Sequence, residues 1–242
     1  MYYSPKQKST QFNCFSPPVM IATFTIEVVL AAYTLWRYKM NTLGKLVILT
    51  LIALGGFQLC EYQVCGSFGL HASSWSRAGY AAITLLPPLG LHILHVLADK
   101  PRRRLVLFAY ASMAGFVGYF LLMPRVFNGY ACTGNYVIFQ IGQHAAWAYG
   151  LYYYGWLITA ITLGIRWAKR LWEGSKKQRQ RVLAIQALVL GYLVFLIPTA
   201  LANSVKPETR SGIPSIMCGF AVIFALILAL YIMPKIGTKR SS

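Results

Sequence analysis

Residues 213–234 read IPSIMCGFAVIFALILALYIMP, 22 residues in which no side chain is charged. An α-helix rises about 1.5 Å per residue, so a segment of this length spans the roughly 30 Å hydrocarbon core of a bilayer. A helix that is apolar on every side is surrounded by lipid or by other protein segments instead of water. The stretch therefore predicts a transmembrane helix.

Apolar stretches of similar length fill most of the remaining chain. Of its 242 residues, 57% are hydrophobic and 12% are charged, about half the charged share of a soluble domain. We therefore predict an all-α polytopic membrane protein, a seven-transmembrane helix bundle with an N-terminal tail at 1–17, a membrane domain at 18–234 and a C-terminal tail at 235–242. The expected spans are 18–37, 43–64, 79–98, 105–124, 143–166, 182–204 and 213–234.

Two of these spans carry irregular features. The third contains Pro87-Pro88, and a proline pair removes backbone donors, which predicts a kink and carbonyl groups that neighbouring helices must satisfy. The fifth follows the apolar run 136–143, which we expect to extend that helix outward. It is also rich in aromatic residues, and its tyrosines pack against neighbours or line a cavity.

Basic residues predict the orientation of the bundle. With the N-terminus outside and the C-terminus in the cytoplasm, 17 of the 23 Lys and Arg residues fall in inner segments, as the positive-inside rule requires. No secretory signal is apparent in residues 1–17, so the first span is expected to direct insertion. The inner basic residues lie within 37–45, 100–104, 166–181 and 235–240.

The net charge of +18 bears on the expected partners. Because the basic residues lie in loops between spans, we interpret them as topology signals that attract anionic lipids at the inner face, and we expect no nucleic-acid binding. The bilayer is the expected environment, in a prokaryotic cytoplasmic membrane. Seven spans leave no room for an output domain, so a partner subunit or homo-oligomer is expected.

Four of the five cysteines fall at or near the outer face, where disulfides form. A bridge between Cys65 and Cys132 would tie the loop after the second span to the loop after the fourth. A second bridge between Cys14 and Cys60 is the other candidate, and spacing alone does not fix the connectivity.

Ionisable residues within spans are the candidates for chemistry, because a charge in the membrane is costly and usually has a function. Counting residues along each span places Glu61 in the outer half and Glu27 near the centre. On the same count His144 lies at the outer end of the fifth span, and His92 and His95 lie in the inner half of the third.

These depths predict an outer pocket for a small ligand, ion or proton. Its expected residues are Gln58, Glu61, Gln140, Gln143 and His144. A second, central group would hold Glu27, His92 and His95. The common structural alternative is that all of these residues form interhelical hydrogen bonds.

Two other kinds of site remain open. Carboxylates and imidazoles bind metals, so Glu61, His144, His92 and His95 are candidate ligands for zinc or iron. Glu27 and Glu61 are, alternatively, candidates for a proton relay.

Two resemblances bear on the family. The segments CFSP at 14–17 and QLCE at 58–61 resemble a family of uncharacterised prokaryotic multi-pass proteins with a Cys-Phe-Ser N-terminal element and Gln-Leu-x-Glu in helix two. This implies a helical membrane protein with a role for Cys14 and Glu61. The number of intramembrane histidines is similar to that of seven-span hydrolases related to alkaline ceramidase and adiponectin receptors, which implies zinc.

The sequence thus favours a membrane sensor or binding protein that acts through a partner. A membrane-embedded metal-dependent hydrolase or oxidoreductase and a small proton-linked transporter are the alternatives.

Overall fold

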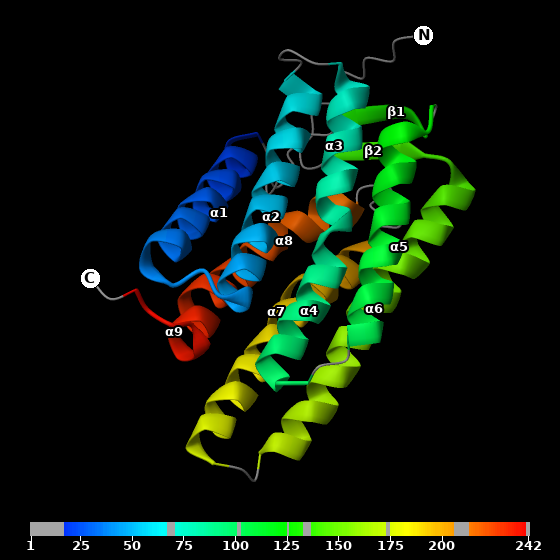
Figure 1. Ribbon diagram of the computed structural model, residues 1–242. Helices are drawn as coiled ribbons and strands as arrows, with labels where there is room; N and C mark the ends of the chain where they lie inside the picture. Colours follow the sequence, from blue (N-terminus) through cyan, green and yellow to red (C-terminus); the bar gives the residue numbers. More distant parts are fainter. Residues whose placement is uncertain are drawn as a thin grey trace.

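The described residues fold into an elongated helical bundle with a small antiparallel pair of strands (Figure 1). The computed structural model describes residues 17–66, 71–100, 103–124, 126–132, 137–172, 175–205 and 213–240. Its elements are α1 (Pro17–Arg37), α2 (Thr42–Gly66), α3 (Ala72–Thr84), α4 (Leu86–Ala98), α5 (Arg103–Leu122), β1 (Phe127–Cys132), β2 (Val137–Ile141), α6 (Gln143–Leu171), α7 (Lys176–Val205), α8 (Ile213–Leu226), the π-helix η2 (Ile227–Ile232) and α9 (Met233–Ile236).

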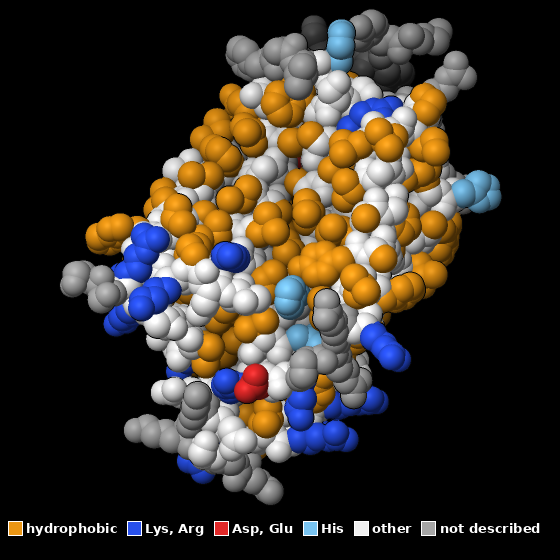
Figure 2. All heavy atoms as spheres, viewed as in Figure 1, with side chains coloured by type: hydrophobic (Ala, Val, Ile, Leu, Met, Phe, Trp, Pro, Cys, Tyr) orange, Lys and Arg blue, Asp and Glu red, His pale blue; other side chains and the backbone are white. Residues whose placement is uncertain are grey.

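By length and composition, six helical segments in the described part of the chain are long and apolar enough to cross a membrane. They comprise α1, α2, the α3–α4 pair, α5, α7 and the run from α8 to α9. Large apolar side chains such as Trp36 and Leu122 are exposed, as expected for helices that face lipid. In Figure 2, apolar side chains cover the middle of the visible face and most Lys and Arg side chains gather toward its lower end. The protein is therefore an all-α polytopic membrane protein.

The predicted break in the third span lies between α3 and α4. Pro88 has no N–H to offer the carbonyl of Thr84 four residues earlier, and the Tyr152 hydroxyl of α6 donates to that carbonyl at 2.7 Å instead. The Thr84 hydroxyl in turn donates to the carbonyl of Tyr80 at 2.6 Å. The carbonyl group left free at the kink is thus hydrogen-bonded by a neighbouring helix, as the sequence predicted.

The predicted outward extension of the fifth span is wrong. Residues Val137–Ile141 form β2, which pairs antiparallel with β1, and α6 begins only at Gln143. The alternation of β-branched and aromatic residues with Gln140 suits a strand, and Gly142 takes an extended backbone before α6.

A disulfide fixes this hairpin to the bundle. Cys65 at the end of α2 is bonded to Cys132 at the end of β1, which confirms the first predicted bridge. Cys60 is a free, buried thiol, so the second predicted bridge is absent from the structure. Its predicted partner, Cys14, lies outside the described residues.

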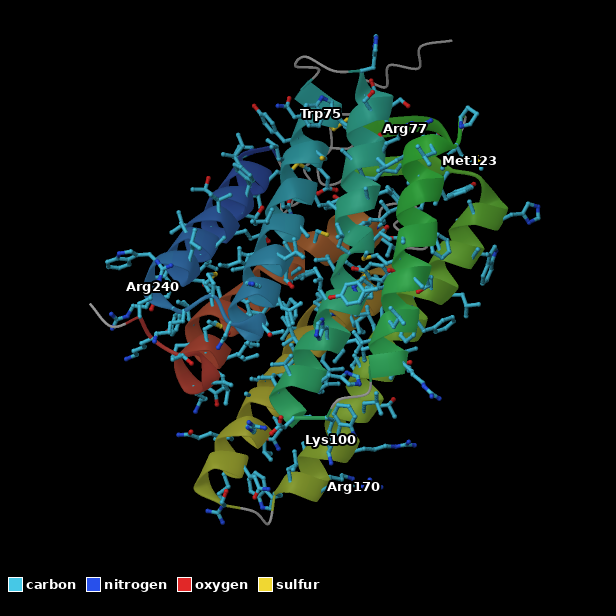
Figure 3. All side chains as sticks on the ribbon, viewed as in Figure 1. Trp75, Arg77, Lys100, Met123, Arg170 and Arg240 are labelled. Carbon is cyan, nitrogen blue, oxygen red and sulfur yellow. A yellow bond between two sulfur atoms is a disulfide. The ribbon has the colours of Figure 1, made fainter. Side chains whose placement is uncertain are left out.

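Charged side chains lie at both ends of the bundle. At the hairpin end, Arg77 donates to the carbonyls of Phe120 and Leu121 and so caps the C-terminal end of α5. Lys100 and Arg170 lie at the opposite end of the molecule (Figure 3). There Asp99, at a left-handed φ of 54° after α4, forms a 2.8 Å ion pair with Arg181.

Candidate functional site

The Glu61 carboxyl group lies inside the bundle, between α2 and α8. Its side chain is 1% exposed, and the Ser215 hydroxyl of α8 donates a hydrogen bond to it. Its Oε1 atom has no hydrogen-bond partner among the described residues. The carboxyl group is therefore only partly satisfied, although it is fully enclosed.

Glu27 of α1 is the second buried acid. It is 0% exposed, and neither carboxyl oxygen finds a hydrogen-bond partner within the described part of the chain. It lies against Gly55 of α2, where an added Cβ would meet its Oε2 at 3.6 Å. Glu27 is also close enough to Glu61 for the two groups to interact electrostatically.

Other polar groups surround this carboxyl pair. The amide of Gln58 is one α2 turn before Glu61, and its Nε2 atom is buried with no partner among the residues described. The Cys218 thiol of α8 interacts electrostatically with both Glu27 and Glu61. In the described ranges neither acid forms a salt bridge. An uncompensated carboxylate in such surroundings is unfavourable, so protons or a bound cation must balance the charge.

A cavity of about 420 Å³ lies beside the carboxyl pair, between α3, α6, α8 and β2. Its volume is within the range of small-molecule sites. Two of its residues, Gln140 and Ala146, are exposed, which places them at its mouth. The lining consists of Tyr80, Ile83, Phe139, Gln140, Ile141, Ala146, Tyr149, Gly150, Tyr153, Tyr154, Ile213, Pro214, Met217 and Cys218.

The cavity and the carboxyl pair share walls. Cys218 lines the cavity and interacts with both acids, and Tyr80 lines it and interacts with Glu61. Pro214, also in the lining, directly precedes Ser215, the hydrogen-bond partner of Glu61. Neither acid is itself in the lining, so a molecule in the cavity would lie near the carboxyl pair with Tyr80 and Cys218 in its wall.

The residues of the predicted outer pocket separate into different places. Gln58 and Glu61 are buried together, and Gln140 lies at the cavity mouth. His144 is exposed on α6, so the structure does not bring it to Glu61. The side chain of Gln143 lies outside the described residues.

The central group separates as well. The Nδ1 atom of His92 hydrogen-bonds the Tyr110 hydroxyl at 3.1 Å, and Nδ1 of His95 donates to the Leu91 carbonyl at 2.8 Å. The His95 ring also packs edge-to-face on Trp167. Glu27 interacts with Glu61 instead of these histidines.

The candidate metal ligands are not gathered either. In the described ranges, no three His, Cys, Asp or Glu residues lie close enough together to bind one metal ion. Glu61, His144, His92 and His95 thus do not form a single site in this structure.

Sequence reasoning missed the contribution of α8. Ser215 and Cys218 both lie beside the carboxyl pair, and they are three residues apart in an otherwise apolar span. This i, i+3 spacing puts them on one helix face and was the available signal. Tyr80, near the start of the third predicted span, gave no such signal.

No protein-family model matches the chain, and no curated protein matches it. The carboxyl pair and the cavity are therefore the features of this chain that bear on its function.

Proposed function

We propose that this protein is a membrane sensor or binding protein whose intramembrane pocket receives a small ligand and acts through a partner subunit. The observation that carries the proposal is the carboxyl pair of Glu27 and Glu61, which is buried without a basic partner among the described residues, beside a 420 Å³ cavity. Buried polar groups without partners reduce stability, so their presence favours a functional reason.

The proposal includes seven spans with the N-terminus outside. Helix α6 is the seventh span: at 29 residues it is long enough, although its tyrosines and basic residues make it less apolar than the other six. The Cys65–Cys132 disulfide supports the orientation, because disulfides form on the non-cytoplasmic side of a membrane. Lys100 and Arg170 at the other end agree with the positive-inside rule.

In this orientation the cavity mouth faces the outside of the cell. A ligand would enter past Gln140 and Ala146, contact the tyrosines, and reach the wall formed by Tyr80 and Cys218. The carboxyl pair behind that wall supplies the charge that distinguishes one ligand from another. The role of Glu61 that the QLCE resemblance implies is consistent with this position.

Differential thiol modification tests the proposal, because the chain offers a matched pair of cysteines. Cys60 and Cys218 are both free and buried, at 6% and 3% exposure, and only Cys218 lines the cavity. In a Cys14→Ser background, a small impermeant methanethiosulfonate applied outside sealed cells should modify Cys218 much faster than Cys60. Equal rates for the two thiols, or modification of Cys218 only from the inside, would refute the outward-facing pocket.

The proximity of Glu27 and Glu61 favours one second function, proton-linked transport. Two adjacent carboxyl groups in a bundle can exchange a proton along a path. Proteoliposomes that contain the protein and a pH-sensitive dye measure this directly. A proton flux that is abolished in Glu27→Gln and absent from empty liposomes would establish the transporter over the binding protein.

A further inference from the structure

We infer that the ligand of this pocket is a small organic cation with a quaternary or protonated ammonium group. The inference rests on the proposed function and names the chemical class of its ligand. Two independent features support it, namely the aromatic walls of the cavity and the charge of the groups around it.

Aromatic rings make up much of the lining. Five of the fourteen lining residues are aromatic: Tyr80, Phe139, Tyr149, Tyr153 and Tyr154. The Tyr80 ring stands at 83° to Phe139, and Tyr153 stands at 77° to Tyr154. The lining rings come from α3, β2 and α6, so aromatic surface is present on several sides of the cavity, and aromatic side chains are the groups by which proteins bind quaternary ammonium groups through cation–π interactions.

The ionisable groups in and beside the cavity are tyrosines, a thiol and two carboxyl groups, and none of those described is basic. No Lys, Arg or His residue is in the lining, and Cys218 and Tyr80 lie within electrostatic range of Glu61. A cation in the cavity would offset the charge of an ionised carboxyl group that otherwise has no compensating partner. An anionic ligand would find no positively charged side chain in the lining. A purely apolar ligand would leave the two carboxyl groups without a compensating partner.

Two tyrosine hydroxyls are available to the ligand. The Tyr149 hydroxyl is hydrogen-bonded to that of Thr84 at 3.2 Å, and Tyr154 donates to the sulfur of Met217. The hydroxyls of Tyr80 and Tyr153 have no hydrogen-bond partner among the residues that the structure describes, although both side chains line the cavity. These two hydroxyl groups can form hydrogen bonds with a polar substituent of the cation.

The test compares choline with its uncharged isostere 3,3-dimethyl-1-butanol on the purified full-length chain. The readouts are protection of Cys218 from N-ethylmaleimide, with Cys60 as the internal control, and the shift of the thermal unfolding midpoint. We expect choline to protect Cys218 and raise the midpoint, and the isostere to do so only at far higher concentration. Protection by both compounds at equal concentration would overturn the inference in favour of an apolar ligand.

Variants test the contribution of the aromatic walls and that of the carboxyl group separately. Tyr153→Leu should weaken choline protection by between about twofold and thirtyfold, whereas Tyr153→Phe, which keeps the ring, should retain it. Glu61→Gln should weaken it as well. Equal protection in the Leu and Phe variants would overturn the cation–π contribution. If Cys218 reacts faster than Cys60 but neither compound protects it, the ligand class is wrong and the pocket stands. If the two thiols react alike, the proposed function itself fails.

Discussion

Replacing Glu27 by Leu should stabilise the protein, although Glu27 is one of its most deeply buried residues. The side chain is 0% exposed, and both carboxyl oxygens are without a hydrogen-bond partner among the described residues. A buried polar group left unsatisfied costs about 1–3 kcal/mol. Leucine fills a similar volume without polar atoms, so we expect the free energy of unfolding to rise by about 1–3 kcal/mol.

The opposite sign is expected if Glu27 only holds helices together. An interhelical hydrogen bond in a membrane protein contributes about 0.6 kcal/mol on average, and its removal would lower stability by that amount or more. The sign of the change therefore distinguishes a functional acid from a structural one. Stabilising replacements at functional positions are a recognised consequence of selection for activity over stability.

Steric-trap unfolding in bicelles measures the free energy directly. Thr34→Val is the matched control on the same helix, because Thr34 is equally buried but its hydroxyl donates to the Leu30 carbonyl at 2.7 Å. We expect that control to be neutral or slightly destabilising. A loss of about 0.6 kcal/mol or more in Glu27→Leu would refute the interpretation of Glu27 as an unpartnered acid.

Three further predictions concern the bundle around the site. Gly90→Ala should destabilise by about 1–3 kcal/mol, because an added Cβ would overlap the Tyr192 hydroxyl oxygen, and Tyr192→Phe should recover part of the loss in a double-mutant cycle. Tyr152→Phe should cost about 1–3 kcal/mol by leaving the carbonyl freed by the proline pair unsatisfied, and an unchanged midpoint would contradict this. Replacing Cys65 and Cys132 by Ser, which opens a link across 67 residues, should lower the unfolding free energy by at most about 4 kcal/mol, and the fully reduced wild type should match that variant.

Hydrophobicity alone predicted most of the fold, because a helix in lipid must satisfy its own backbone and so shows its length in the sequence. Each of the seven predicted stretches corresponds to a helix or to a kinked pair of helices, and the break at Pro87-Pro88 was predicted with its cause. The hairpin was missed because the strand Val137–Ile141 is as apolar as a helix end. Its antiparallel pairing with β1 is not revealed by composition.

The site was harder to predict, because depth along a helix says little about which faces meet. Residue counting separated Glu27 from Glu61, yet the two acids interact across the contact between α1 and α2. Residue counting also assumed that every helix is perpendicular to the membrane and starts at the same membrane surface. Ser215 and Cys218 complete the site from α8, and only the packing of α8 against α1 and α2 places them there.

The most direct test asks whether the carboxyl pair and the cavity are one site. It compares the rates at which a cationic and a neutral methanethiosulfonate of similar size modify Cys218, in wild type and in Glu61→Gln, with Cys14 and Cys60 replaced by Ser. If Glu61 acts on the cavity, the cationic reagent reacts preferentially in wild type and loses that preference in the variant. An equal preference in both proteins would show that the carboxyl pair does not act on the contents of the cavity.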